Sequence, residues 1–443
     1  MIRMTGRRVR PILDEVLRKP GAPTRLTLDH RRATLAQLVD PADGAPIDEV
    51  LVTYFAAPRS YTGEDVAEIC LHGGPWLVAE AIRVVTSLGA DPARPGEFTR
   101  RALMFGKLDL ARAEAVQALV VAQSSAAAKL AAQQLAGGLS ARYERLRADL
   151  VVLGALLEGP LEFPEDTAED EDRAAAEALA LLGGVEGAIR CLMGNDQAAR
   201  RIVSGLSIPI IGRPNVGKSS IFNGLLGSDR AIVSPRPGTT RDCIEGMVTV
   251  AGQLVRLIDT AGIGVALDEL DAEAMRRAEQ ALDEADAVVL VLDRSAPPHS
   301  SDAELAERLL GRSVIVVANK SDLPPRLSHD DVASLNLPSS PILASAADGT
   351  GLPTLWEKLG EAVEHLSGPR TGTHDLVTSA RQRALLARAS EDLDRAGANI
   401  RGRRSELAVE DVRVAALTLG EILGESAPDA VLDEVFRTFC IGK

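Results

Sequence analysis

Hydrophobic positions follow two different spacings along this chain, and the change of spacing divides the chain into segments. Up to about residue 115, short β-like apolar runs at 49–57 and 66–74 alternate with a helical pattern at 75–90. From about residue 110 to 159, apolar residues recur at helical spacing with one Gly-Gly interruption, and after an acidic stretch over 162–173 another helical run extends to about residue 203. This pattern predicts an α+β N-terminal domain followed by long helices.

A different pattern begins at residue 206, where apolar runs with the composition of buried strands alternate with helical segments. Such continuous apolar runs are typical of parallel strands covered on both faces. After about residue 366 the helical pattern returns. The apolar runs are 206–212, 254–260, 287–293, 313–320 and 341–347.

The order of these sequence patterns along the chain predicts an α/β domain with a parallel sheet, inserted into an all-α helical domain. The alternative, three independent domains in a row, is left open by the pattern alone. The expected domains are 1–115, the discontinuous pair 116–205 and 366–443, and the insertion 206–365.

Composition narrows the class of protein. The chain has 443 residues, 46% of them hydrophobic but only 3% aromatic, which favours Ala/Leu-rich helices over an all-β architecture. Because no run of about eighteen apolar residues occurs, we expect no membrane span. The N-terminus lacks the apolar segment of a signal peptide, and the four cysteines show no metal-ligand spacing. A cytoplasmic protein with reduced thiols is therefore expected.

The net charge of −14 argues against a broad surface that coats nucleic acid. The charge is uneven, however, because residues 381–404 carry seven arginines against three acidic residues. This run fits either a local RNA-binding face or a solvated helix face.

The stretch from Gly212 to Ser219 matches the phosphate-binding pattern G-x-x-x-x-G-K-[ST] and follows a predicted strand. Its glycines allow backbone N–H groups to approach phosphates, and the next helix points its N-terminus at them. Lys218 is expected to pair with the β- and γ-phosphates, and Ser219 to bind Mg²⁺. The expected nucleotide contacts in this stretch are Asn215, Val216, Gly217, Lys218, Ser219 and Ser220.

Three further elements follow in the order that a GTPase requires. Asp259 and Gly262, in the sequence DTAG, suit a metal-facing carboxylate and a backbone sensor of the γ-phosphate. The sequence Asn319-Lys320-Ser321-Asp322 ends another strand, and Asp322 can accept both N1–H and N2–H₂ of guanine. Ser345, Ala346 and Ala347 then suit a loop that donates a backbone N–H to guanine O6.

The segment 234–242 has the character of a switch loop, in which Thr239 or Thr240 can complete the Mg²⁺ shell. Ile263 follows the DTAG glycine, where many small GTPases carry a glutamine that orients water, so hydrolysis must recruit another group. The candidate carboxylates are Asp268, Glu269, Asp271 and Glu273.

With these motifs the chain resembles the MnmE (TrmE) family of tRNA-modification GTPases over nearly its whole length. The segments that carry the resemblance are 60–75, 94–116, 161–166, the phosphate loop, PGTTRD, DTAGI and the terminal FCIGK (439–443). The resemblance also implies that the chain begins about twenty residues inside the family's first segment.

The resemblance implies a potassium-activated GTPase that forms a homodimer and acts with the flavoprotein MnmG. Together they install an aminomethyl or carboxymethylaminomethyl group at C5 of the wobble uridine (position 34) of certain tRNAs. The one-carbon unit comes from 5,10-methylenetetrahydrofolate, for which 5-formyltetrahydrofolate is an analogue. The cofactors are therefore GTP, Mg²⁺, K⁺ and the folate.

By position, the resemblance assigns further roles. Mg²⁺ is bound by Ser219 and Thr240, and the catalytic residues are Lys218, Cys440 and a carboxylate at Asp271, with Glu273 as its rival. The family's carboxylate is a glutamate, so Asp271 would be one methylene shorter. The family's K⁺ ligands match Asn215, Ser234, Arg236 and Thr239. The nucleotide contacts also include Ser234, Thr239 and Thr240. The folate contacts match Arg3, Glu68, Lys107 and Lys443.

Two other functions fit part of the pattern. A regulatory or ribosome-assembly GTPase would use the same nucleotide motifs but leaves FCIGK unexplained. A scaffold that binds GTP without hydrolysing it would fit the shorter side chain of Asp271. Folate binding separates the first alternative from the leading hypothesis, and potassium-dependent turnover separates the second.

Overall fold

The computed structural model describes residues 1–22, 24–162, 168–194, 196–227, 244–260, 276, 279–337, 339–367, 376–425, 427–440 and 442. The chain forms two compact units. Unit 1 comprises 1–120, 132–190 and 379–443, and unit 2 comprises 121–131 and 191–378. The chain therefore leaves unit 1 twice, at residues 121 and 191, and returns to it at residues 132 and 379. The fold class expected from the sequence is confirmed, and the exact domain limits stay a prediction.

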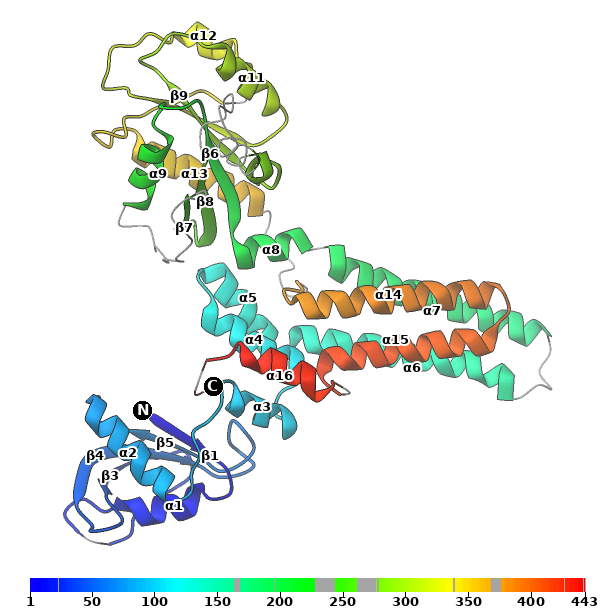
Figure 1. The fold of residues 1–443 in the computed structure, drawn as a ribbon. Helices are drawn as coiled ribbons and strands as arrows, with labels where there is room; N and C mark the ends of the chain where they lie inside the picture. The colour runs from blue at the N-terminus through cyan, green and yellow to red at the C-terminus, as the bar shows by residue number, and fades with distance from the viewer. Residues whose placement is uncertain are drawn as a thin grey trace. The chain divides into compact units, whose positions relative to one another are not determined.

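Unit 1 begins with a five-stranded antiparallel sheet in the order β1-β5-β4-β3-β2 (Figure 1). Helices α1 (Val9–Val16) and α2 (Pro75–Ser87) cover one face, and their apolar residues share a core with inward residues of the strands, such as Val50, Val52 and Ile69. The strands are β1 (Ile2–Thr5), β2 (Leu17–Arg18), β3 (Ala33–Val39), β4 (Pro46–Phe55) and β5 (Val66–Cys70).

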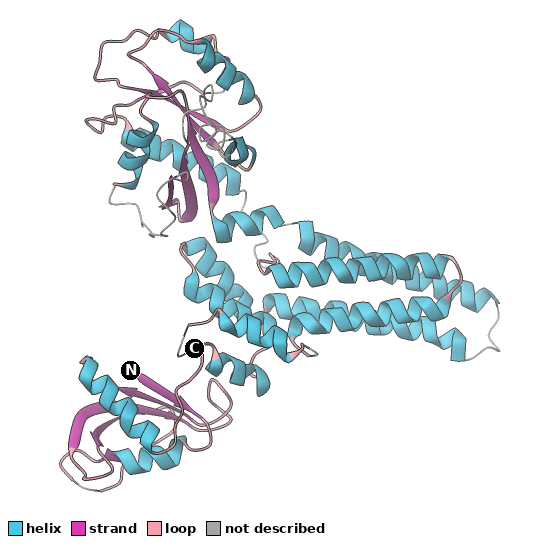
Figure 2. Ribbon diagram, viewed as in Figure 1, coloured by secondary structure: helices cyan, strands magenta, loops and turns pink. Residues whose placement is uncertain are grey.

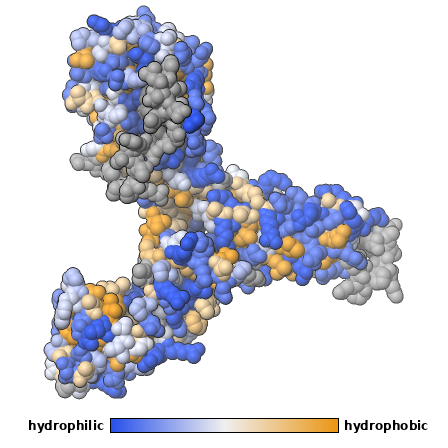
Figure 3. All heavy atoms as spheres, viewed as in Figure 1, coloured by the Kyte–Doolittle hydropathy of each residue, from blue (hydrophilic) through white to orange (hydrophobic). Residues whose placement is uncertain are grey.

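The rest of unit 1 is helical (Figure 2). Helix α15 packs along both α14 and α6. Among the described residues no helix is long and apolar enough to cross a membrane, and Figure 3 shows a mostly hydrophilic surface over the long helices. The helices are α3 (Glu97–Met104), α4 (Leu110–Val121), α5 (Ser125–Leu135, which begins in unit 2), α6 (Gly138–Glu162), α7 (Ala168–Gly194, which ends in unit 2), α14 (Ala380–Arg401), α15 (Ser405–Leu423) and α16 (Asp429–Arg437).

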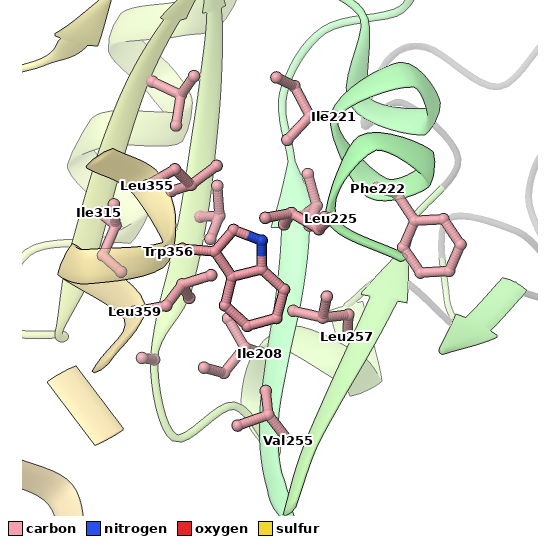
Figure 4. Packing of buried hydrophobic residues seen from close by; sticks show 14 of the residues in the cluster. Ile208, Ile221, Phe222, Leu225, Val255, Leu257, Ile315, Leu355, Trp356 and Leu359 are labelled. Carbon is pink, nitrogen blue, oxygen red and sulfur yellow. The ribbon is translucent and has the colours of Figure 1, made fainter. Parts of the chain in front are cut away.

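Unit 2 contains a six-stranded sheet in the order β11-β10-β9-β6-β8-β7. Alternate residues of β9 face opposite sides: Val289 and Val291 pack towards α9 and α13, whereas Leu290 packs towards α11. Figure 4 shows Trp356 of α13 in the first of these cores. The elements are α8 (Asp196–Ser204), β6 (Leu206–Ile211), α9 (Lys218–Leu226), β7 (Ile244–Val250), β8 (Gln253–Asp259), β9 (Val288–Asp293), α11 (Ser300–Arg308), β10 (Val314–Asn319), α12 (His329–Ala333), β11 (Ile342–Leu343) and α13 (Leu352–Ser367).

This sheet is mixed: the predicted strands are parallel, as expected, and one further strand at its edge is antiparallel. Strands β8, β6, β9, β10 and β11 are parallel, but the edge strand β7 runs antiparallel to β8. The reason is local. Only Ala251 and Gly252 join β7 to β8, both with positive φ, and so short a reversal forces antiparallel pairing.

Candidate functional site

The phosphate loop lies between β6 and α9, and its two motif glycines are required by geometry. Gly212 has φ +154° and Gly217 has φ +99°. A Cβ atom on Gly212 would lie 2.4 Å from the carbonyl oxygen of Val291, and one on Gly217 would lie 2.1 Å from Nδ2 of Asn319. Side chains at either position would therefore displace the loop from the strands beneath it.

Lys218 begins α9 and is buried, with 7% of its surface exposed. Its Nζ donates hydrogen bonds to the carbonyl oxygens of Gly212 (3.2 Å) and Arg213 (2.9 Å). Burial lowers the pKa of Lys218, and the nearby Asp259 carboxylate partly opposes that shift. The ammonium group is thus held inside the loop, where a bound phosphate would lie. Asn215, Ser219 and Ser220 are exposed around it.

Asp259 stands at the end of β8, beside β6. It is 8% exposed, and its Oδ1 is buried without a hydrogen-bond partner among the described residues. The next residue, Thr260, donates from Oγ1 to the carbonyl oxygen of Ile210 at 2.8 Å. A buried carboxylate oxygen without a hydrogen-bond donor destabilises the fold unless a ligand supplies the missing donor or positive charge. The residues present therefore fit a Mg²⁺ ion held through phosphate oxygens and water.

Asn319, at the end of β10, connects the phosphate loop to the predicted guanine loop. Its Nδ2 donates to the carbonyl oxygen of Val216 (2.8 Å), and its Oδ1 accepts from the backbone N–H of Ala346 (3.1 Å). Asn319 and Ser345 are buried, whereas Asp322 and Ala347 are exposed. The exposed carboxylate of Asp322 is therefore available to a base, whereas the N–H groups of Ser345 and Ala346 already donate to Thr350 and Asn319.

The sequence reasoning missed Asp293, at the end of β9. Lys320 donates to its Oδ2 at 2.6 Å, and Ser295 donates to its Oδ1 from both Oγ and the backbone. Burial acts to raise the pKa of Asp293, but the bonds from Lys320 and Ser295 outweigh it, so the pKa lies below its usual value. An acidic residue at the end of a buried strand was the sequence feature that could have indicated Asp293.

Some predicted site residues lie outside the described residues. They are Ser234, Arg236, Thr239, Thr240, Gly262, Asp268, Glu269, Asp271, Glu273 and Lys443.

A second cluster, in unit 1, brings together two of the predicted folate contacts. Arg3 on β1 and Glu68 on β5 are register partners, and Nη2 of Arg3 lies 2.7 Å from Oε1 of Glu68. Arg3 also donates from Nη1 to the carbonyl oxygen of Gly442 (3.4 Å), and its guanidinium lies 5.9 Å from the ring centre of Phe98. The sheet and the C-terminal end of the chain therefore meet at Arg3.

The C-terminal segment is anchored before it reaches Arg3. Phe436 and Phe439 pack with Leu110 of α4, and the carbonyl oxygen of exposed Cys440 accepts from the N–H of Gly96 at 3.4 Å. Lys107 lies beside the segment before β5, where its Cε would be 3.2 Å from a Cβ atom on Gly63. The structure therefore groups Arg3, Glu68 and the C-terminal segment, and gives no contact of Lys107 with that group among the described residues.

The fold and the first site define a P-loop protein of the GTPase class. The phosphate loop joins β6 to α9, an acidic residue ends β8, and Asn319 connects the loop to the segment 345–347. Comparison with protein families agrees with this class. The family model described as "MnmE helical domain" matches residues 110–440, and the model described as "GTP-binding protein TrmE N-terminus" matches residues 1–107.

Curated relatives match along the whole chain. The tRNA modification GTPase MnmE of Moorella thermoacetica is 38% identical over 451 residues, covering 100% of this chain and 96% of that protein. The MnmE proteins of Syntrophus aciditrophicus and Aquifex aeolicus are each 36% identical, with the same two coverages. The chain belongs to the MnmE (TrmE) family of tRNA modification GTPases.

Proposed function

We propose that the chain hydrolyses GTP and couples this reaction to modification of the wobble uridine of tRNA at C5. The observation that carries the proposal is that Asn319 donates to Val216 and accepts from Ala346, because these two bonds join a phosphate-binding loop to a loop that can recognise guanine. Family membership supplies the tRNA substrate.

In this proposal each part of the site has one task. Lys218 neutralises the β- and γ-phosphates, and the first turn of α9 directs backbone N–H groups at them. Asp322 accepts from N1–H and N2–H₂ of guanine, while the loop 345–347 donates one backbone N–H to O6. When bound, Mg²⁺ withdraws charge from the phosphate oxygens. Ser219 and Thr240 would hold the ion, and Asp259, whose Oδ1 is buried without a partner among the described residues, would add negative charge beside it.

Activation of water requires a group other than residue 263, which is isoleucine and cannot polarise water. We assign this role to Asp271, with Glu273 as the alternative. A potassium ion bound by Asn215, Ser234, Arg236 and Thr239 would add positive charge where related GTPases use an arginine.

The proposed one-carbon donor is 5,10-methylenetetrahydrofolate, bound near Arg3, Glu68, Lys107 and Lys443. The side chains of Arg3 and Glu68 are 28% and 27% exposed, so a ligand can reach their ion pair. Glu68 can accept from the amidine-like edge of a pterin, and the cations suit an anionic folate tail. Cys440 is the proposed thiol of the modification reaction.

The proposed working form is a homodimer in the cytoplasm, bound to MnmG and tRNA. The proposed division of labour follows the predicted domains: 1–115 for folate and dimerisation, 116–205 with 366–443 as the helical domain, and 206–365 for GTP.

The nucleotide part of the proposal is tested by Asp322→Asn. Xanthine has a carbonyl oxygen where guanine has the N2 amino group, so an amide can donate where the carboxylate accepted. We expect the variant to lose GDP affinity and gain xanthosine diphosphate affinity, measured by calorimetry. Equal loss for both nucleotides would contradict the assignment of Asp322 to the base.

A further inference from the structure

Asp302 is a buried acidic residue that belongs to none of the nucleotide motifs. It lies in the first turn of α11, and only 4% of its surface is exposed. An acid at this third helical position commonly turns back to cap its own helix, and an aspartate is seldom buried unless it is paired. Here its Oδ1 accepts from Nε of Arg213 at 2.8 Å. The carboxylate of Asp302 is therefore used by another part of the chain.

Arg213 is the second residue of the phosphate loop. Its side chain is 17% exposed, so the ion pair with Asp302 is largely shielded from water. Its carbonyl oxygen accepts from Nζ of Lys218 at 2.9 Å. The same residue therefore connects the loop to α11 through its side chain and to the phosphate-binding lysine through its backbone. Without Asp302, a shielded guanidinium would lose this partner, and the loop would have to move for it to reach water.

Helix α11 gives this contact a fixed support. Its inward leucines share a core with β9 and with Ile211, the last residue of β6. Gly212 follows Ile211 directly, so the loop begins at the same core against which α11 packs. Because a close-packed core resists displacement, Asp302 is held at a constant place beside the start of the loop. The leucines are Leu305 and Leu309 of α11 and Leu290 and Leu292 of β9.

The phosphate loop is thus held at two points. Asn319 donates to the carbonyl oxygen of Val216 at 2.8 Å, and Asp302 binds Arg213 nearer the start of the loop. Asn215, between these two points, is exposed and has a φ of +65°, which is uncommon for a residue with a side chain. Such a backbone conformation persists where the surrounding structure fixes it. The bond from Asp302 supplies one of the two constraints.

We propose that Asp302 is a positioning residue for phosphate binding, which acts through Arg213 to hold the first half of the loop in the shape that receives the β-phosphate. All the groups involved belong to unit 2. The inference rests on the proposed nucleotide site and adds to it a residue that lies outside its motifs.

The test compares GDP with GMP, because GMP keeps the guanine base and lacks the β-phosphate. In Asp302→Ala, GDP affinity should fall about tenfold, as expected for the loss of one charge-assisted hydrogen bond, while GMP affinity stays nearly unchanged. Calorimetry on the full-length chain measures GDP binding, and competition against GDP measures GMP binding. A general loosening of unit 2 would instead lower both affinities together.

Asp286→Ala is the matched control. Oδ1 of Asp286 accepts from Nε of Arg201, also at 2.8 Å, and its Oδ2 accepts from the N–H of Ser207 near the start of β6. The control therefore removes an ion pair of the same geometry from the same unit. It should lower the melting temperature and leave the ratio of GDP affinity to GMP affinity unchanged.

Two further variants keep the test decisive if Asp302→Ala fails to fold. Asp302→Asn keeps the size of the side chain and an acceptor oxygen but removes the charge, so GDP affinity should fall by a smaller factor. In an Arg213→Gln background, Asp302→Asn should cause no further loss, because the connection through Arg213 is already cut. Additive losses would overturn the proposal that Asp302 acts through Arg213.

The outcomes separate the role of Asp302 from the nucleotide site on which it rests. A wild type that binds neither GDP nor GMP would overturn the site itself. A wild type that prefers GDP, together with an Asp302→Ala variant that keeps the full preference, would overturn the role of Asp302 alone.

Discussion

Nδ2 of Asn319 lies 2.8 Å from the carbonyl oxygen of Val216, and this bond fixes the phosphate loop to the end of β10. The same side chain accepts from Ala346, so one buried amide sets the distance between the phosphate and base ends of the site. Both bonds are made by side-chain atoms of a residue that is 2% exposed.

Asn319→Ala should therefore weaken guanine nucleotide binding. Leaving buried partners unsatisfied costs about 1–3 kcal/mol, so GDP affinity should fall roughly 5- to 150-fold. Calorimetric titration measures this change. Asn399→Ala is a matched control, since Asn399 makes a comparable bond to Asp411 (2.8 Å) in unit 1 and should leave GDP affinity unchanged. Equal effects of the two variants on GDP affinity would contradict a specific role for Asn319.

Arg381 has a structural role in the helical unit. Its Nε donates to Oε1 of Glu114 on α4 (2.7 Å), and its two terminal nitrogens donate to the carbonyl oxygens of Glu421 and Ile422 (3.0 Å each). Arg381→Ala should lower stability by roughly 2–3 kcal/mol, seen as a lower denaturant midpoint. Exposed Arg388 on the same helix provides the control, and its replacement by Ala should be near neutral. A stable Arg381→Ala variant that had lost tRNA binding would instead favour the RNA-face reading of this arginine run.

Much of the fold could be predicted from the sequence, because strands buried on both faces give continuous apolar runs. Strands β6, β8, β9 and β10 all lie in the expected segments. Strand β7 was missed, since its sequence IEGMVTV is short and mixed in polarity. The long helical run also breaks before α5, at 122–124, without the Gly-Gly signal used to divide it.

The site was predictable in its motifs but not in its connections. Asn319 was expected to contact nucleotide, whereas its bonds to Val216 and Ala346 depend on strand order, which the motif does not contain. The pair Glu114–Arg381 is 267 positions apart in the chain, so no local pattern could have indicated it. Such long-range partners are fixed by the tertiary fold alone.

Gly184 in α7 offers a stabilising substitution. It lies in a regular helix, and an added Cβ would meet no atom within 4 Å. Gly184→Ala should raise the free energy of unfolding by about 0.5–1 kcal/mol, because alanine restricts the unfolded chain and favours the helix. Gly397→Ala in α14 should gain less or lose stability, since its Cβ would lie 3.1 Å from Leu182. Denaturant titration measures the free energy of unfolding of both variants. A larger increase for Gly397→Ala than for Gly184→Ala would contradict this prediction.

Asp293 should make the stability of unit 2 depend on acid pH. Its pKa is held below the usual 3.8, with the bonds from Lys320 and Ser295 outweighing burial. A depressed carboxyl pKa stabilises the fold above the unfolded value and loses that contribution as pH falls through the folded value. Near neutral pH the wild type should therefore have a higher melting temperature than Asp293→Asn. This difference in melting temperature should close below about pH 3.8. A gap that stays constant down to pH 3 would show that the charge of Asp293 is not its cause.

The measurement that tests the central claim most directly is GTP hydrolysis by the purified full-length chain in potassium and in sodium buffer. We expect turnover that is strongly stimulated by potassium and abolished by Lys218→Ala. Nucleotide that is bound but hydrolysed no faster in potassium would contradict the proposed ion site around Asn215. A chain that does not bind GTP at all would contradict the assignment of the site itself.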